Sequence, residues 1–127
     1  MIYVVDDMPC LTQLYALLLE RTGCLVKTFI DRAEVLSALK ADQRKPDLLI
    51  TDYRGHSMPL EHFLHQCLAV HPALRILMAS GWSEIDDRFF QIRPCQFIQK
   101  PFTPDEFRQA IRAALASVDF PVVPTSQ

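Results

Sequence analysis

Residues 2–7 read Ile-Tyr-Val-Val-Asp-Asp, an uninterrupted run of mostly β-branched and aromatic side chains that ends in two acids. A continuous apolar run of this kind is typical of a strand that is buried on both faces, as in a parallel sheet. Similar short runs follow over residues 25–30, 48–51, 75–79 and 97–99. The sequence therefore predicts five strands.

Longer amphipathic stretches separate these runs. Apolar side chains recur in each stretch at the spacing of one helix face. The five stripes are Leu11, Leu14, Tyr15 and Leu18; Val35, Leu36 and Leu39; Phe63, Leu64, Cys67 and Leu68; Ile85, Phe89 and Ile92; and Phe107, Ile111, Leu115 and Val118. Asp31 and Thr103 stand before two of these helices, each with a Glu three residues later, which is a capping-box pattern.

Strands that alternate with helices predict an α/β fold with right-handed crossovers. We expect a five-stranded parallel sheet of order 2-1-3-4-5, doubly wound with five helices, which is the flavodoxin-like arrangement. The chain has 127 residues and is 50% hydrophobic, so one domain can bury a real core. We expect this domain over residues 1–119 and an extended tail, or the start of a linker, over residues 120–127.

Composition excludes several classes of protein. The net charge of -2 argues against a domain whose main task is to bind nucleic acid or an anionic membrane. The sequence lacks a signal-peptide pattern and the run of about 20 apolar residues that would cross a bilayer, so we expect a cytoplasmic protein.

The cysteines of the chain are Cys10, Cys24, Cys67 and Cys95. None forms a Cys-x-x-Cys pair, and we expect small buried hydrophobic residues in a reducing compartment.

Polar side chains follow the predicted strands at their carboxyl ends. Asp6 and Asp7 follow the first strand, Asp52 the third, Ser80 the fourth and Lys100 the fifth. Because ligands of open parallel sheets bind at this edge, we expect these side chains to converge there.

Clustered carboxylates repel one another and attract a hard divalent cation with oxygen ligands, for which Mg²⁺ is suited. A carboxylate is also a competent phosphoryl acceptor, and Ser80 and Lys100 could stabilise charge on the phosphoryl oxygens. The plainer alternatives are helix caps for Asp6, Asp7 and Ser80. For Asp52 the alternative is a turn cap, and for Lys100 it is a solvated strand end.

Four motifs stand at these strand ends in a fixed order. They are Val4-Val5-Asp6-Asp7, Leu49-Ile50-Thr51-Asp52, Ala79-Ser80-Gly81 and Gln99-Lys100-Pro101-Phe102. Together they resemble the receiver domain of two-component response regulators, the chemotaxis-type phosphoacceptor.

The resemblance assigns roles to individual residues. It implies that Asp52 is the phosphorylated aspartate. It implies that Asp7 binds Mg²⁺ directly and that Asp6 binds it directly or through water. Ser80 and Lys100 would contact the phosphoryl group. Phe97 would match the family's switch aromatic, for which the alternative is an ordinary core residue.

Further implications concern the backbone near the site. The Lys100–Pro101 peptide bond would be cis. The family's metal also takes a backbone carbonyl two residues after the phosphoacceptor, here Arg54. The loop from Asp52 to Met58-Pro59 is two residues longer than the family's usual spacing, so the role of Arg54 stays open.

The function implied is a phosphorylation-dependent switch and not an enzyme. A histidine kinase or phosphotransfer protein would donate the phosphoryl group, and the face of the fourth helix, fifth strand and fifth helix would change its affinity for an output partner. We expect no direct nucleic acid or membrane contact, and a homodimer stays open. Two alternatives are a pseudo-receiver that binds partners without phosphorylation and a haloacid-dehalogenase-type phosphohydrolase. The latter class needs a second Asp two residues after the nucleophile, where Asp52 is followed by Arg54.

Overall fold

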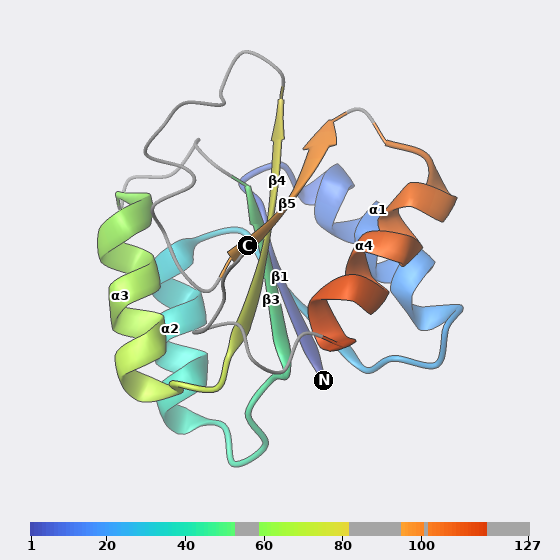
Figure 1. Ribbon diagram of the computed structural model, residues 1–127. Helices are drawn as coiled ribbons and strands as arrows, with labels where there is room; N and C mark the ends of the chain where they lie inside the picture. The colour runs from blue at the N-terminus through green and yellow to red at the C-terminus, as the bar shows by residue number, and fades with distance from the viewer. Residues whose placement is uncertain (53–58, 82–94, 101, 117–127) are drawn as a thin grey trace, which may run out of the picture.

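The computed structural model describes residues 1–52, 59–81, 95–100 and 102–116. Strands and helices alternate along these ranges, except that the last two described strands follow each other without a described helix between them (Figure 1). The elements are β1 (Ile2–Val5), α1 (Pro9–Glu20), β2 (Val26–Phe29), α2 (Arg32–Ala41), β3 (Leu48–Asp52), α3 (Leu60–Val70), β4 (Arg75–Gly81), β5 (Cys95–Lys100) and α4 (Pro104–Ala116).

The strands form one five-stranded sheet in the order β2-β1-β3-β4-β5, and every pairing between neighbours is parallel. This is the order expected for a flavodoxin-like sheet. Strand β1 lies between β2 and β3, with Val5 opposite Thr51 in the register. The residues that follow these two, Asp6 and Asp52, are therefore neighbours at the carboxyl edge.

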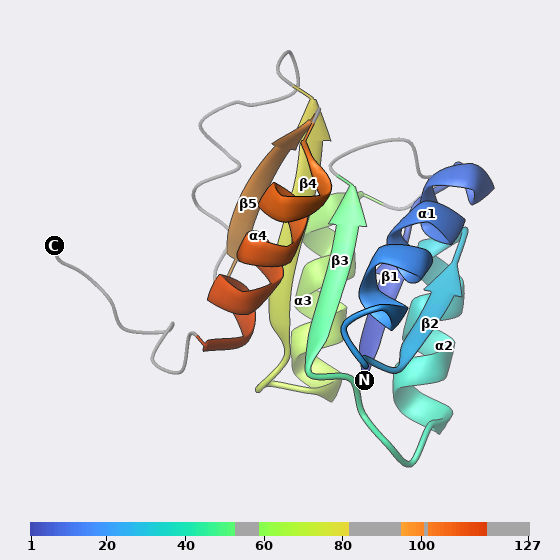
Figure 2. The same cartoon turned by 90° about the vertical axis from the view of Figure 1, so that its right-hand side faces the viewer.

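Helices cover both faces of the sheet. Helices α2 and α3 lie on one face and α1 and α4 on the other, as Figures 1 and 2 show. Alternate residues of β1 enter different cores: Tyr3 and Val5 pack with the α2 and α3 side, and Ile2 and Val4 with the α1 and α4 side. Burial on both faces explains why the strand sequence is apolar without alternation.

Side-chain caps begin two of the helices as the sequence predicts. Asp31 accepts a 3.1 Å hydrogen bond from the backbone N–H of Ala33 at the start of α2. At the start of α4, Thr103 Oγ1 accepts from the backbone N–H of Glu106 at 3.1 Å, and Glu106 accepts from the backbone N–H of Thr103 at 2.7 Å. The second pair is a complete capping box.

Helix α1 packs most of the expected stripe against the core, but Leu14 is an exception. Leu14 is 48% exposed, whereas Thr12 and Leu19 are buried. Tyr15 sets this orientation, because its ring stacks on Phe102 at 5.8 Å and on Phe107 at 5.1 Å between centroids. The most buried positions of the helix are therefore Thr12, Tyr15 and Leu19, with Leu11 and Leu18 of the expected stripe packed beside them.

Several other boundaries differ from expectation. Strand β4 continues to Gly81 and β5 spans Cys95–Lys100, because the two strands stay paired to their last residues. Cys10 is exposed, so the expectation of burial is wrong for it. Four helices lie in the described part of the chain. The helix expected through residues 85–92 and the tail 120–127 lie outside it.

The described helices are also all too short or too polar to cross a lipid bilayer.

Candidate functional site

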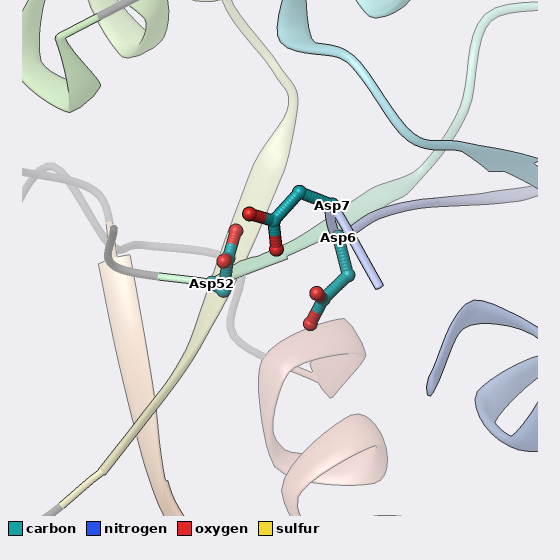
Figure 3. A group of neighbouring side chains, drawn as sticks. All are labelled: Asp6, Asp7 and Asp52. Atoms are coloured by element: carbon teal, nitrogen blue, oxygen red, sulfur yellow. The ribbon is translucent and has the colours of Figure 1, made fainter. Parts of the chain in front are cut away.

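Three carboxylates meet at the carboxyl edge of the sheet. Asp6 and Asp7 follow β1, and Asp52 is the last residue of β3. One oxygen of each carboxylate lies within 4.8 Å of the others. Figure 3 shows the Asp7 and Asp52 carboxylates close together with Asp6 beside them. Asp6 and Asp52 are buried, whereas Asp7 is exposed, so the cluster opens to solvent on the Asp7 side.

Local backbone geometry fixes the two acids after β1. Oδ1 of Asp6 accepts a 3.0 Å hydrogen bond from the backbone N–H of Met8. This bond turns the chain between β1 and α1, and Pro9 then occupies the first turn of the helix, where a missing N–H costs nothing. The acids therefore do not cap α1, whose N-cap is Met8 without a side-chain bond.

The donor set fits a hard divalent cation. All three groups are carboxylates, they come within bridging range of one another, and one of them is exposed. Mg²⁺ prefers oxygen ligands and binds proteins through one or two carboxylates while keeping several waters. Asp7 and Asp52 would hold such an ion, with Asp6 next to them.

A buried arginine lies beside the cluster, and the sequence analysis missed it. Arg32 begins α2, and its side chain is almost completely buried. Nη2 donates a 2.9 Å hydrogen bond to the backbone carbonyl of Asp52 and lies 3.9 Å from Oδ1 of the same residue. The guanidinium also lies over the ring of Phe63, 5.5 Å from its centroid. Arg32 thus links α2, α3 and the end of β3.

One sequence signal could have pointed to Arg32. The helix dipole disfavours a cation in the first turn of a helix, yet Arg32 occupies the first position of α2. A basic residue in that place needs a compensating acid. The capping pattern of Asp31 and Glu34 already explained why a helix starts here, so the unusual position of Arg32 was overlooked.

Burial changes the titration of groups around the cluster. Burial lowers the pKa of the Arg32 guanidinium, and the carboxylates of Asp52 and Asp7 oppose that change. Burial also raises the pKa of Tyr15, with additional contributions from Asp6 and Asp52. Tyr15 therefore stays neutral beside the acids. Burial raises the pKa of the Cys67 thiol to about 12, against the effect of Arg32.

The backbone places two further predicted residues at the same edge. Asp52 is paired with Ala79, so Ser80 is one residue farther along the neighbouring strand. Lys100 is the last residue of β5 and is paired with Gly81.

Phe97 lies on β5 opposite Met78. The side chains of Ser80, Phe97 and Lys100 lie outside the described part of the structure, as do Arg54 and the Lys100–Pro101 peptide bond.

The sequence matches the family model "Response regulator receiver domain" over residues 2–112. The chain belongs to the response regulator receiver family. The resemblance in the four strand-end motifs is thereby confirmed.

Curated relatives carry the same domain within longer proteins. The transcriptional regulatory protein CreB of Escherichia coli is 29% identical over 119 residues, which cover 92% of this chain and 51% of CreB. The DNA-binding transcriptional regulator NtrC of Escherichia coli is 29% identical over 91% of this chain and 24% of its own length. This receiver domain therefore spans about half or less of these relatives.

Solved structures share the fold. The receiver domain of NtrX from Brucella abortus has a TM-score of 0.79 and 30% identity, and the match covers 91% of this chain and 98% of that one. A receiver domain protein from Clostridium thermocellum has a TM-score of 0.78 at 23% identity, with 90% and 92% of the two chains covered. Its low identity makes it evidence of fold alone.

Proposed function

We propose that this receiver domain accepts a phosphoryl group on Asp52 in a reaction that requires Mg²⁺. The observation that carries the proposal is the meeting of Asp6, Asp7 and Asp52 at the carboxyl edge. Membership of the receiver family supports the same conclusion. Asp52 is 8% exposed, so its carboxylate is largely shielded but lies next to the open, Asp7 side of the cluster.

Transfer from a phosphohistidine needs an ionised and positioned carboxylate. An oxygen of Asp52 attacks phosphorus while the P–N bond to the donor histidine breaks, and the released imidazole nitrogen takes up a proton. The bond from Arg32 to the Asp52 carbonyl holds this end of β3 in place. Mg²⁺ bound at Asp7 and Asp52 would supply charge stabilisation for the transferring oxygens.

Ser80 and Lys100 are proposed to contact the phosphoryl group. Their support is their position at the ends of β4 and β5, on the same edge as Asp52. Lys100 would supply positive charge and Ser80 a hydrogen bond. Phe97, near the middle of β5, is the proposed aromatic switch residue that responds to the movement of Ser80.

The partners are proposed from the family assignment. A histidine kinase or phosphotransfer protein would donate the phosphoryl group. Phosphorylation would shift a two-state equilibrium of the domain. The face expected to respond consists of the helix predicted through residues 85–92, of β5 and of α4, and its affinity for an output domain or protein would change. We place the reaction in the cytoplasm, without direct nucleic acid or membrane binding. A homodimer formed through this face is also part of the proposal.

Acetyl phosphate with Mg²⁺ tests the assignment of Asp52. Intact-mass spectrometry should show one added phosphoryl group on the wild type and none on Asp52→Asn. Asp47→Asn is the matched control, because Asp47 lies at the opposite edge, where it accepts from the N-terminal amine at 3.1 Å. An added phosphoryl group on Asp52→Asn would refute the assignment.

The pseudo-receiver alternative has one supporting observation, the contact between Arg32 and Asp52, which places a protein cation where a charged ligand would act. Absence of phosphorylation of the wild type in this assay would favour it. The family match argues against the phosphohydrolase alternative. Multiple turnover of p-nitrophenyl phosphate would revive it.

A further inference from the structure

Arg32 brings a fixed positive charge to the acidic cluster. Its Nη2 is 2.9 Å from the Asp52 carbonyl oxygen and 3.9 Å from Asp52 Oδ1. The guanidinium is planar and remains protonated in proteins, so it cannot lose a proton to reduce its repulsion with a second cation. It is also held against Phe63, which leaves it little room to withdraw.

A metal ion at this site would lie close to that charge. Mg²⁺ binds carboxylate oxygens at about 2 Å, so an ion on Asp52 Oδ1 would lie within about 6 Å of Nη2. The two cations would repel each other at this distance, because burial weakens screening by solvent. The same guanidinium already reduces repulsion among the carboxylates when no metal is bound.

We propose that Arg32 is a built-in counter-ion of the Asp6, Asp7 and Asp52 cluster that weakens Mg²⁺ binding and holds Asp52 in position without metal. Arg32 is therefore a positioning residue that sets the metal concentration at which the site works. The inference rests on the Mg²⁺ site of the proposed function, but it does not require that Asp52 be phosphorylated.

A direct metal titration tests this role. Mn²⁺ is the probe, because free and bound Mn²⁺ are distinguished by electron paramagnetic resonance, and Mg²⁺ then competes for the site. Arg32→Gln removes the charge and keeps a hydrogen-bond donor. Its dissociation constants for both ions should fall about tenfold or more, which equals about 1.4 kcal/mol.

Two variants control for other effects of the substitution. Arg32→Lys keeps the charge, so its metal affinity should stay near that of the wild type. Arg112→Gln removes an exposed charge from α4 and should leave metal binding unchanged. A purely structural role for Arg32 predicts the opposite result, since a disordered site binds metal more weakly. Equal or weaker binding by folded Arg32→Gln overturns the proposal.

Asp52→Asn provides a second test if Arg32→Gln does not fold. In EDTA, the melting temperature of Asp52→Asn should fall below that of the wild type, because the guanidinium loses its charged partner. A higher melting temperature would mean that carboxylate repulsion dominates, and it would overturn the proposal. Neither metal titration nor melting uses a phosphoryl donor, so failure of the proposed phosphorylation would leave these results interpretable.

Discussion

The guanidinium of Arg32 donates a 2.9 Å hydrogen bond to the backbone carbonyl of Asp52, twenty residues farther along the chain. The bond joins the first turn of α2 to the last residue of β3, on the edge where the acids meet. Arg32 is 1% exposed, so this contact is part of the core and also part of the site. The stability of the fold and the chemistry of Asp52 consequently share one residue.

Substitution of Arg32 by lysine should therefore lower stability even though charge is kept. Lysine lacks the planar fork that reaches the Asp52 carbonyl while stacking on Phe63. We expect a loss of about 1 to 2 kcal/mol in the free energy of unfolding. Urea denaturation in EDTA measures it, with Arg112→Lys as the exposed control. An unchanged midpoint would show that the fork does not contribute.

Metal binding should depend on the exposed acid. With Mg²⁺ at about 100 times its dissociation constant, the wild type should gain about 2.7 kcal/mol of stability. Asp7→Asn should lose most of this gain, because it removes a proposed ligand, and it should fold because Asp7 is exposed. Melting with and without Mg²⁺ provides the measurement. Asp47→Asn should keep the full gain, and an equal loss in both variants would contradict a specific site.

Acid should weaken a contact at the amino edge of the sheet. Hydrogen bonds from Tyr3 and from Lys27 lower the pKa of Asp42. Because the folded-state pKa is lowered, the stabilisation is present above the ordinary aspartate pKa of about 3.9. It is lost as pH falls through the folded-state value.

The corresponding measurement is a pair of melting curves against pH. Asp42→Asn should be less stable than the wild type at neutral pH, and the difference should shrink below about pH 4. Asp105→Asn provides an exposed control. A difference that stays constant down to the lowest pH would show that the ionised form of Asp42 has no role.

The capping box of α4 should contribute measurably to stability. Thr103→Ala removes the Oγ1 acceptor for the Glu106 N–H, and we expect a cost of about 1 kcal/mol. Chemical denaturation tests this value. Ser37→Ala, at an exposed position within α2, should have little effect or a slightly stabilising one. Equal effects of the two substitutions would exclude a specific cap.

The strand order and the meeting of the acids could be predicted because both follow from local patterns. Apolar runs marked the strands, and Asp6 and Asp52 follow such runs directly. Parallel strands then bring their carboxyl ends to one edge whatever the details of packing. The helix caps at Asp31 and Thr103 could also be predicted, because the capping pattern is local and lies within four residues.

Features that depend on distant contacts could not be predicted. Leu14 belongs to the predicted stripe of α1, but the stacking of Tyr15 on Phe102 and Phe107 orients the helix so that Leu14 stays exposed. Arg32 looks like an ordinary surface residue at a helix start, and only the position of Asp52 explains its burial. In both cases the outcome depends on which partner the side chain meets across the fold.

The aromatic stack also has a mechanical consequence. Phe102 and Phe107 lie 5.2 Å apart between centroids and each contacts the Tyr15 ring, so the start of α4 is tied to the middle of α1. Phe102 is only two residues from Lys100 in the sequence. We expect a displacement of the Lys100 backbone to disturb this aromatic cluster and so to reach Tyr15 on α1, at the other end of the sequence.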